Sequence, residues 1–159
     1  MLDSLLIRNF RLFKEFTIER LSRVNLFVGK NNSGKSCLLE ALRVYASEAD
    51  SSVLIDLVFA REEDWESLTV QREAGFIPES ENPLKSLFYG YRFPDLEKNG
   101  IEIGDATHKT DRIHIYLRAY QFIEDQVDLR RLHPVSPQEI ESENVQTALE
   151  WKKGDESDF

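Results

Sequence analysis

A glycine-rich loop with one lysine and one serine is the part of this chain best suited to chemistry. Gly29, Gly34, Lys35 and Ser36 fit the spacing G-x-x-x-x-G-K-[ST]. Glycines let a backbone curl round a phosphate chain with its N–H groups pointing inward, and a helix that follows adds the positive end of its dipole. Lys35 is then expected to reach the β and γ phosphates, and the Ser36 hydroxyl to ligate a Mg²⁺ that bridges phosphate oxygens. An ordinary Gly-Asn-Ser turn is the structural alternative.

The segments on both sides of the loop are the ones that a phosphate site needs. Four of the five residues from 24 to 28 are apolar, which predicts a short buried strand that leads into the loop. After the loop, apolar residues recur at spacings of three and four, which predicts one face of a helix: Leu38, Leu39, Leu42 and Tyr45. The sequence therefore predicts a strand, a phosphate loop over residues 29–36 and a helix.

Length and composition limit the other properties. With 159 residues, of which 41% are hydrophobic, one core and one domain are expected. The chain has no apolar run of transmembrane length and no secretory signal at its start, and its one cysteine cannot form an internal disulfide. We therefore expect a cytoplasmic protein without a membrane partner. The net charge of −9 argues against DNA binding through this segment as a whole, so any DNA contact is expected elsewhere.

The N-terminal residues carry a resemblance to a known family. The stretch "SLLIRNFRLFKEFTIERL" predicts two strands with a polar connector, because Leu5 and Ile7 alternate in the first and Phe16 and Ile18 in the second. An "IRNFR" strand end, a short hairpin, "VNLFVGKNNSGKS" and "LLEAL" follow in that order. This order resembles the start of the ABC-type ATPase heads of the SMC and RecF group, and most closely the bacterial OLD (overcoming lysogenization defect) family. The resemblance is strongest over residues 1–46 and extends more thinly to about residue 132.

The resemblance implies a nucleotide site and its residues. Lys35 is the catalytic candidate, Ser36 the Mg²⁺ ligand, and ATP with Mg²⁺ the expected cofactors. Arg11, in "NFR", either approaches the nucleotide and pairs with phosphate or ribose oxygens or is a solvated strand-end arginine. The candidate nucleotide-binding residues are Gly29, Asn31, Asn32, Ser33, Gly34, Lys35, Ser36, Cys37 and Arg11.

Cys37 departs from the family pattern. Many relatives carry a second hydroxyl residue directly after the magnesium-binding serine, whereas this chain has a thiol there. A thiol is a weak hydrogen-bond donor, so the contact to the α-phosphate is expected to come mainly from the Cys37 backbone N–H. We expect the side chain itself to pack inside the protein.

The middle of the chain predicts packing elements. Ser51 or Ser52 is expected to cap a second helix that continues to residue 68, and residues 71–83 read as a loop. Alternating isoleucines in "GIEIGD" and "RIHIYLRAY" predict an antiparallel pair of strands. His114 lies between two of these isoleucines, so it is expected on an exposed sheet face and not in a metal site.

The last residues of the chain are expected to lie outside the packed domain. Residues 133–159 hold seven acidic and two basic residues, which predicts an acidic linker or tail, partly disordered. Within it, "VQTALEWKK" is expected to form a helix turn or two. Residues 1–132 are then the N-terminal portion of an ATPase head.

Two motifs of an ABC-type ATPase are not evident. One is an apolar strand that ends in Asp-Glu, and the other is a Ser-Gly-Gly signature. "VLID", which ends at Asp56, and "FIED", with Glu124 and Asp125, are poor candidates for the acidic strand, and Gln121 is more simply a strand-end glutamine than a magnesium-linking one. We therefore expect an incomplete head: an α/β P-loop NTPase of ABC-ATPase type with an N-terminal β hairpin, a phosphate-loop strand and helix, and an antiparallel β lobe.

The predicted function is the binding of ATP with Mg²⁺, within a complete protein that hydrolyses ATP and closes as a homodimer through its heads. Resemblance to the OLD family adds an expectation of DNA processing or phage defence. The main alternative is a non-hydrolysing nucleotide-binding module that regulates a partner. A phosphotransferase or a GTPase is a second alternative, although the Asn-Lys-x-Asp motif of a GTPase is absent.

Overall fold

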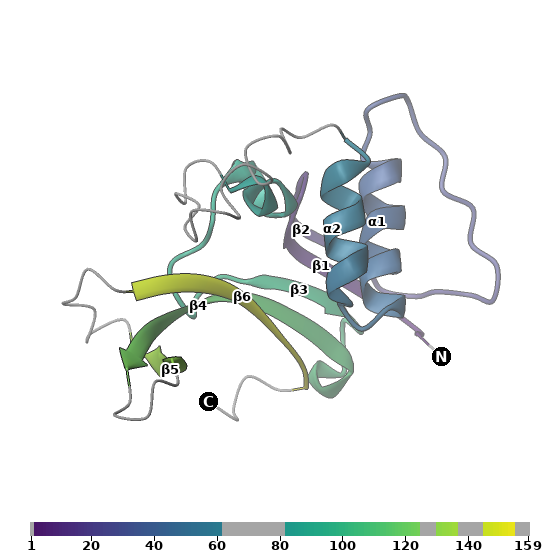
Figure 1. Cartoon of the computed structure of the whole chain (residues 1–159). Helices are drawn as coiled ribbons and strands as arrows, with labels where there is room; N and C mark the ends of the chain where they lie inside the picture. Colours follow the sequence, from purple (N-terminus) through teal and green to yellow (C-terminus); the bar gives the residue numbers. More distant parts are fainter. Residues whose placement is uncertain (1, 62–81, 125–129, 137–144, 155–159) are drawn as a thin grey trace.

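A six-stranded antiparallel sheet carries two helices on one face in the computed structural model (Figure 1). The structure describes residues 2–61, 82–124, 130–136 and 145–154. The strands are β1 (Leu5–Phe10), β2 (Phe13–Ile18), β3 (Ile101–Gly104), β4 (Arg112–Glu124), β5 (Arg130–Val135) and β6 (Val145–Lys153). The helices are α1 (Lys35–Ala46) and α2 (Ser51–Phe59), and short 3-10 turns lie at η1 (Pro83–Leu87), η2 (Tyr89–Tyr91) and η3 (Lys109–Asp111).

The strand order follows from the long strand β4, which pairs along both of its edges. The path β2-β1-β3-β4-β5 is antiparallel throughout, and β6 also pairs with β4. The β6 pairing runs from Ile113↔Lys153 to Gln121↔Val145. Ala119 pairs with Val135 of β5 and with Thr147 of β6, so these two strands take opposite edges of β4. The strand β4 is therefore an interior strand of the sheet.

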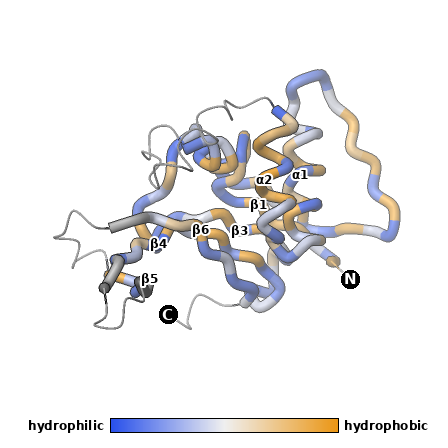
Figure 2. The backbone as a smooth tube through the Cα atoms, viewed as in Figure 1, coloured by the Kyte–Doolittle hydropathy of each residue, from blue (hydrophilic) through white to orange (hydrophobic). Residues whose placement is uncertain are grey.

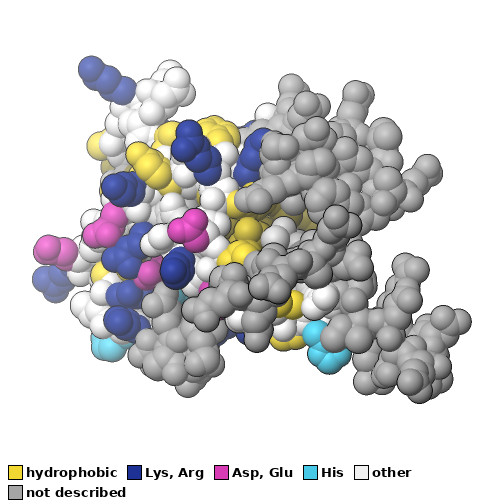
Figure 3. Space-filling view, turned by 90° about the vertical axis from the view of Figure 1, so that its left-hand side faces the viewer, with side chains coloured by type: hydrophobic (Ala, Val, Ile, Leu, Met, Phe, Trp, Pro, Cys, Tyr) yellow, Lys and Arg dark blue, Asp and Glu magenta, His cyan; other side chains and the backbone are white. Residues whose placement is uncertain are grey.

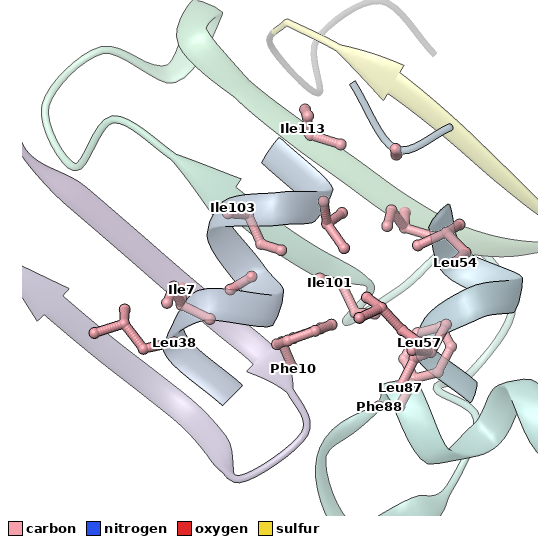
Figure 4. Close-up of a cluster of buried hydrophobic side chains, with 14 of the residues drawn as sticks. Ile7, Phe10, Leu38, Leu54, Leu57, Leu87, Phe88, Ile101, Ile103 and Ile113 are labelled. Carbon is pink, nitrogen blue, oxygen red and sulfur yellow. The ribbon is translucent and has the colours of Figure 1, made fainter. Parts of the chain in front are cut away.

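The core lies between the sheet and the two helices (Figure 4). Strand alternation sends Ile101, Ile103, Ile113 and Ile115 to the helix side, and each of them is fully buried. The buried face of α1 carries Cys37, Leu38, Ala41 and Val44. That of α2 carries Leu54, Leu57 and Val58. Phe10, Leu87 and Phe88 fill the end of this layer beside the hairpin turn.

Several predicted elements are confirmed. The hairpin pairs Leu5 with Ile18 and Phe10 with Phe13. The isoleucine segments pair as expected, with Ile101 opposite Ile115. The phosphate-loop helix is present, although Leu39 lies on its exposed face and not on the buried one.

The second helix begins as predicted but has a different cap. The Asp50 side chain, and not a serine, accepts the hydrogen bond from the Ser52 N–H at 2.9 Å. The helix ends at Phe59, and the remainder of the predicted helix lies outside the described residues, as does almost all of the predicted loop over residues 71–83. An aspartate is as good a cap as a serine, so the sequence alone left the choice open.

Three other expectations are wrong. Residues 24–28 are not a buried strand but an exposed irregular segment. "VQTALEWKK" is not helical, because these residues form β6 and add an edge to the sheet. The description of residues 133–159 as an acidic tail therefore fails for this strand. His114 is buried and not exposed, since strands lie on both sides of β4 at this position.

Candidate nucleotide-binding site

The loop over residues 29–34 is held in a shape that glycine permits. Gly34 has a φ of 90° and is the N-cap of α1 in the left-handed conformation. A Cβ at Gly34 would lie 3.2 Å from Cζ of Phe13, so this side chain of β2 leaves little room for one. Asn32, with a φ of 62°, turns the loop before it, and the Ser33 N–H donates to the Lys30 carbonyl at 3.3 Å. Asparagine tolerates this conformation better than most residues do.

The first turn of α1 is suited to an anion. Its first helical hydrogen bond runs from the Leu38 N–H to the Gly34 carbonyl at 2.9 Å. No side chain caps the helix, and its first turn contains no acidic residue. The backbone N–H groups of the first turn therefore have no partner within the helix, and they lie at the positive end of its dipole. Such an end binds phosphate readily.

The Lys35 ammonium lies over the loop. Its Nζ donates to the Gly29 carbonyl at 2.7 Å and to the Lys30 carbonyl at 2.6 Å. An ammonium has three donors, so these two bonds fix its position and leave one N–H for a further acceptor. The positive charge and the open helix end thus face the same stretch of loop.

Ser36 and Cys37 differ in their surroundings although they are adjacent. Ser36 is exposed at the second residue of α1, where its hydroxyl can serve a metal ion. Cys37 is 2% exposed, which confirms the expected packing of its side chain. The described residues contain no group of three or more His, Cys, Asp or Glu that could hold a metal. A Mg²⁺ here would accordingly take most of its ligands from phosphate and water, as this ion commonly does.

Arg11 is a structural residue in this geometry. It is 3% exposed, so the interpretation as a solvated arginine is wrong. Its Nη1 donates to the Ser86 carbonyl at 3.0 Å and its Nη2 to the Leu57 carbonyl at 2.9 Å. Its Nε lies 3.3 Å from Oε2 of Glu40. These contacts join the hairpin turn to α1, α2 and η1. A contact between Arg11 and the nucleotide stays a prediction that these partners do not favour.

Glu40 and Arg61 form a pair that the sequence reasoning missed. Arg61 donates from Nη2 to Oε1 of Glu40 at 2.7 Å and from Nε at 3.1 Å. The same Nη2 lies 3.4 Å from Sγ of Cys37. Burial lowers the pKa of Arg61, but the hydrogen bond and charge of Glu40, with a contribution from Cys37, outweigh burial and raise it. One signal was present: Glu40 follows Cys37 by three residues and therefore shares the buried face of α1, where a charge needs a partner.

Of the weak candidates for the acidic strand, Asp56 does not contribute to the site. Asp56 lies within α2, so it does not end a strand, and its carboxylate pairs with Arg43 at 2.8 Å on the surface. Asp125 lies outside the described residues, and the side chain of Glu124 is not described. Gln121 lies in β4 and is half-buried.

The segment that leads into the loop is apolar and exposed. Figure 2 shows it as part of the long connection between β2 and α1, which extends away from the body of the molecule. Val24, Leu26 and Val28 are 87%, 86% and 82% exposed. Ser22 and Asn25 bond only to each other here, through the Ser22 N–H and carbonyl, at 2.9 and 2.8 Å. The side chains that should anchor the loop therefore touch solvent.

The loop, its helix and the α/β arrangement fit a P-loop nucleoside triphosphatase. The chain matches the AAA ATPase domain family over residues 1–156, and it therefore belongs to this family. Membership supports nucleotide binding and ATPase chemistry in general, with a divalent metal beside the nucleotide. No helix among the described residues is both long and apolar enough to cross a membrane.

Relatives of this chain share a short stretch with it. The chain is 43% identical over 47 residues to an uncharacterized protein of Methanocaldococcus jannaschii, which is 30% of the chain and 22% of that relative. It is 48% identical over 42 residues to the ATP/GTP phosphatase of Helicobacter pylori, which is 26% of the chain and 11% of that relative. The match thus spans less than a quarter of either relative. No solved structure matches this chain.

Proposed function

We propose that this chain binds ATP with Mg²⁺ through residues 29–36, as the Walker A part of an ABC-type ATPase of the OLD kind. The observation that carries the proposal is the start of α1. It has no capping side chain and no acid in its first turn, and the Lys35 ammonium lies over the loop beside it. Helix end and lysine together offer N–H donors and positive charge to one anion.

Each loop residue has a role in this proposal. The N–H groups of the first turn bind and orient the phosphate chain, and Gly34 keeps its approach clear of side-chain atoms. Lys35 adds charge against the β and γ phosphates, and the Ser36 hydroxyl offers one oxygen to the metal ion. When bound, Mg²⁺ neutralises charge on the phosphate oxygens. This chain therefore supplies positioning and charge.

Residues 24–28 indicate that the site needs neighbouring strands beside the segment that leads into the loop. A run that is apolar on both faces is typical of a strand buried inside a sheet, with neighbours on both edges. Here Val24, Leu26 and Val28 are exposed. We infer that further polypeptide, from the same gene product or another chain, adds strands beside them and completes the ATPase head. The acidic strand and the signature motif belong to that polypeptide in our proposal.

A non-hydrolysing nucleotide-binding module is the second candidate function. The observation that favours it is the lack of a metal-binding cluster among the described residues. In the part of the chain that the structure describes, no evident group orients an attacking water. The name of the Helicobacter pylori relative, ATP/GTP phosphatase, favours hydrolysis by a complete protein, and it keeps GTP as an alternative to ATP.

The wider role is proposed from the resemblance. We place this chain in a cytoplasmic protein that closes as a homodimer through its heads and acts in DNA processing or phage defence. DNA contacts are assigned outside this segment. In support, the chain as a whole carries a net charge of −9. On the one face that Figure 3 draws, Lys and Arg side chains gather with Asp and Glu side chains among them.

The direct test is the thermal unfolding of the 159-residue chain with and without ATP and Mg²⁺. At a hundredfold excess over its dissociation constant a ligand stabilises the folded state by about 2.7 kcal/mol. Lys35→Ala should lose most of this gain and keep the melting temperature of the ligand-free protein, because its contacts are to loop carbonyls. An equal ATP response of wild type and Lys35→Ala would contradict the phosphate-loop assignment. The same measurement with GTP in place of ATP tests whether the site prefers adenine or guanine.

A further inference from the structure

We propose that Arg61 is a nucleotide-binding residue, which takes the α-phosphate side of the phosphate chain. The inference rests on the proposed function and adds a side chain from outside the loop. Arg61 follows directly after α2, whose last turn lies beside the first turn of α1 (Figure 1). Its Nη2 is 3.4 Å from Sγ of Cys37, the third residue of α1. The guanidinium therefore lies one side chain away from the open N–H groups of that turn.

Among the described residues, the charged groups in contact around Arg61 are two guanidinium groups and one carboxylate, which leaves an excess of one positive charge. Glu40, whose side chain is 16% exposed, pairs with Arg61 at 2.7 Å and with Arg11 at 3.3 Å. Two guanidinium groups thus share one carboxylate in a partly buried cluster. Charges that are removed from water interact more strongly than surface charges do, so an anion beside this cluster gains more than it would at an exposed arginine. This excess is independent of the helix dipole.

Arg61 is also the arginine of the cluster that can reach a ligand. The Arg11 side chain is 1% exposed, whereas that of Arg61 is 30% exposed. Its Nε and Nη2 serve Glu40 and Cys37. Its Nη1 has no hydrogen bond to a described residue. A guanidinium held on one edge by a carboxylate presents its other N–H groups in a fixed direction, which suits a phosphate oxygen.

The chemistry of Cys37 explains why such a residue is needed here. The position after the magnesium-binding serine places its backbone N–H near the α-phosphate, but a thiol is a weak donor. In this chain the thiol is buried and its neighbour is a guanidinium. Arg61 therefore supplies the strong donor that a hydroxyl side chain would otherwise provide at this point of the site.

The experiment measures ATP and ADP affinities of the 159-residue chain by calorimetry with Mg²⁺ present. Loss of one charge-assisted hydrogen bond is worth about 1.4 kcal/mol or more, or roughly tenfold in affinity. Arg61→Ala should weaken ATP and ADP by the same factor, because both carry the α-phosphate. Lys35→Ala should weaken ATP more than ADP. Arg61→Lys, which keeps the charge and loses the planar fork, should lie between wild type and Arg61→Ala.

Arg43→Ala is the matched control. Arg43 also joins α1 to α2 through an ion pair, to Asp56 at 2.8 Å, but both side chains are about half-exposed on the surface. It should leave both affinities unchanged. Circular dichroism of each ligand-free variant checks the fold. If Arg61→Ala is poorly folded, Arg61→Lys and the double variant Cys37→Ser with Arg61→Lys replace it, and the serine should restore part of the lost affinity.

The outcomes separate this inference from the proposed function. Binding by wild type with no change in Arg61→Ala and Arg61→Lys would overturn the role of Arg61 alone. A loss in Arg61→Ala no larger than that in Arg43→Ala would do the same. If wild type bound neither nucleotide at millimolar concentration, the phosphate-loop assignment would fall together with this inference.

Discussion

Residues 24–28 and residues 113–117 are apolar segments of similar length, and the protein treats them in opposite ways. Leu26 is 86% exposed, whereas Leu117 is 4% exposed. The difference lies in the neighbours. The strand β4 has β6 along one edge and β3 and β5 along the other, with helices over one face. Among the described residues, no strand pairs with residues 24–28. Burial is therefore a property of the partners as much as of the residues.

This comparison separates a region whose apolar side chains are covered from one whose apolar side chains face solvent. The strands β1 to β6 pair into one sheet that buries isoleucines against the helices, and the loop over residues 29–34 lies between α1 and an exposed segment (Figure 1). Because an exposed apolar run gains free energy when it is covered, we expect that any strand added beside residues 24–28 would also fix the loop. The comparison teaches that an apolar segment of this chain is buried only where neighbouring strands and helices cover it.

The largest expected effect is a difference in stability between two equal substitutions. Leu117→Ala removes a buried side chain and should lower the free energy of unfolding by about 2–5 kcal/mol. Leu26→Ala should change it by less than about 0.5 kcal/mol, because the side chain already faces water. Urea denaturation of the 159-residue chain measures both. A comparable loss in the two variants would show that residues 24–28 are buried in this chain after all.

Some parts of the fold could be predicted from the sequence. They are the parts whose contacts are local or whose apolar residues follow a regular spacing. The hairpin, the start of α1 and the β3–β4 pair follow from alternation and helical spacing within short windows. The long-range features could not be found in this way. "VQTALEWKK" has no strict alternation, and it becomes a strand because β4 offers an open edge from Ile113 to Gln121. The burial of His114 follows from the same event.

The candidate site shows the same division. The motif located the loop, because the spacing of Gly29, Gly34, Lys35 and Ser36 is fixed by phosphate chemistry. It gave no information on Arg11, whose partners Leu57 and Ser86 are far away in the chain. Nor did it reveal Arg61, which meets Glu40 only because α2 runs back toward the start of α1.

A smaller effect on stability is expected from pH, through Asp105 directly after β3. Burial tends to raise the pKa of Asp105, but hydrogen bonds from Thr107, His108 and Ser4 outweigh it and hold the pKa well below its usual range. When folding lowers the pKa of a carboxyl group, the group stabilises the folded state at pH values above its unfolded pKa of about 3.9. This stabilisation is lost as the pH falls through the pKa of the folded state. Wild type should therefore lose stability below about pH 4.

Asp105→Asn tests this contribution. Because two backbone N–H groups donate to the buried carboxylate, at 2.7 Å from Thr107 and 2.8 Å from His108, the amide should cost roughly 1–3 kcal/mol at pH 7. It should also flatten the acid dependence between about pH 4 and 2. Denaturant titrations at three pH values measure both effects. An unchanged acid dependence would place the acid-sensitive group elsewhere. Nucleotide affinity at pH 7 should not change, because Asp105 follows β3 and is not part of the loop over residues 29–36.

The smallest expected effect is on DNA binding. With a net charge of −9, the chain should bind duplex DNA weakly. Each neutralised phosphate contributes about −0.9 to the slope of log affinity against log salt, so the slope should be shallow. Fluorescence anisotropy across a salt series measures it. Tight binding with a slope that corresponds to about six phosphate contacts would move DNA recognition into this segment.

The most direct test of the account compares nucleotide binding with turnover. Phosphoryl transfer depends on positioning and charge stabilisation, and this chain offers the cradle, Lys35 and one metal ligand. The measurement is phosphate release by residues 1–159 across a concentration series, beside a longer natural product that contains this segment. We expect the 159-residue chain to bind ATP and to turn it over hardly at all, and the longer product to gain activity steeply with its own concentration. Robust turnover by the short chain, independent of concentration and abolished by Lys35→Ala, would show that a complete active site lies within these residues.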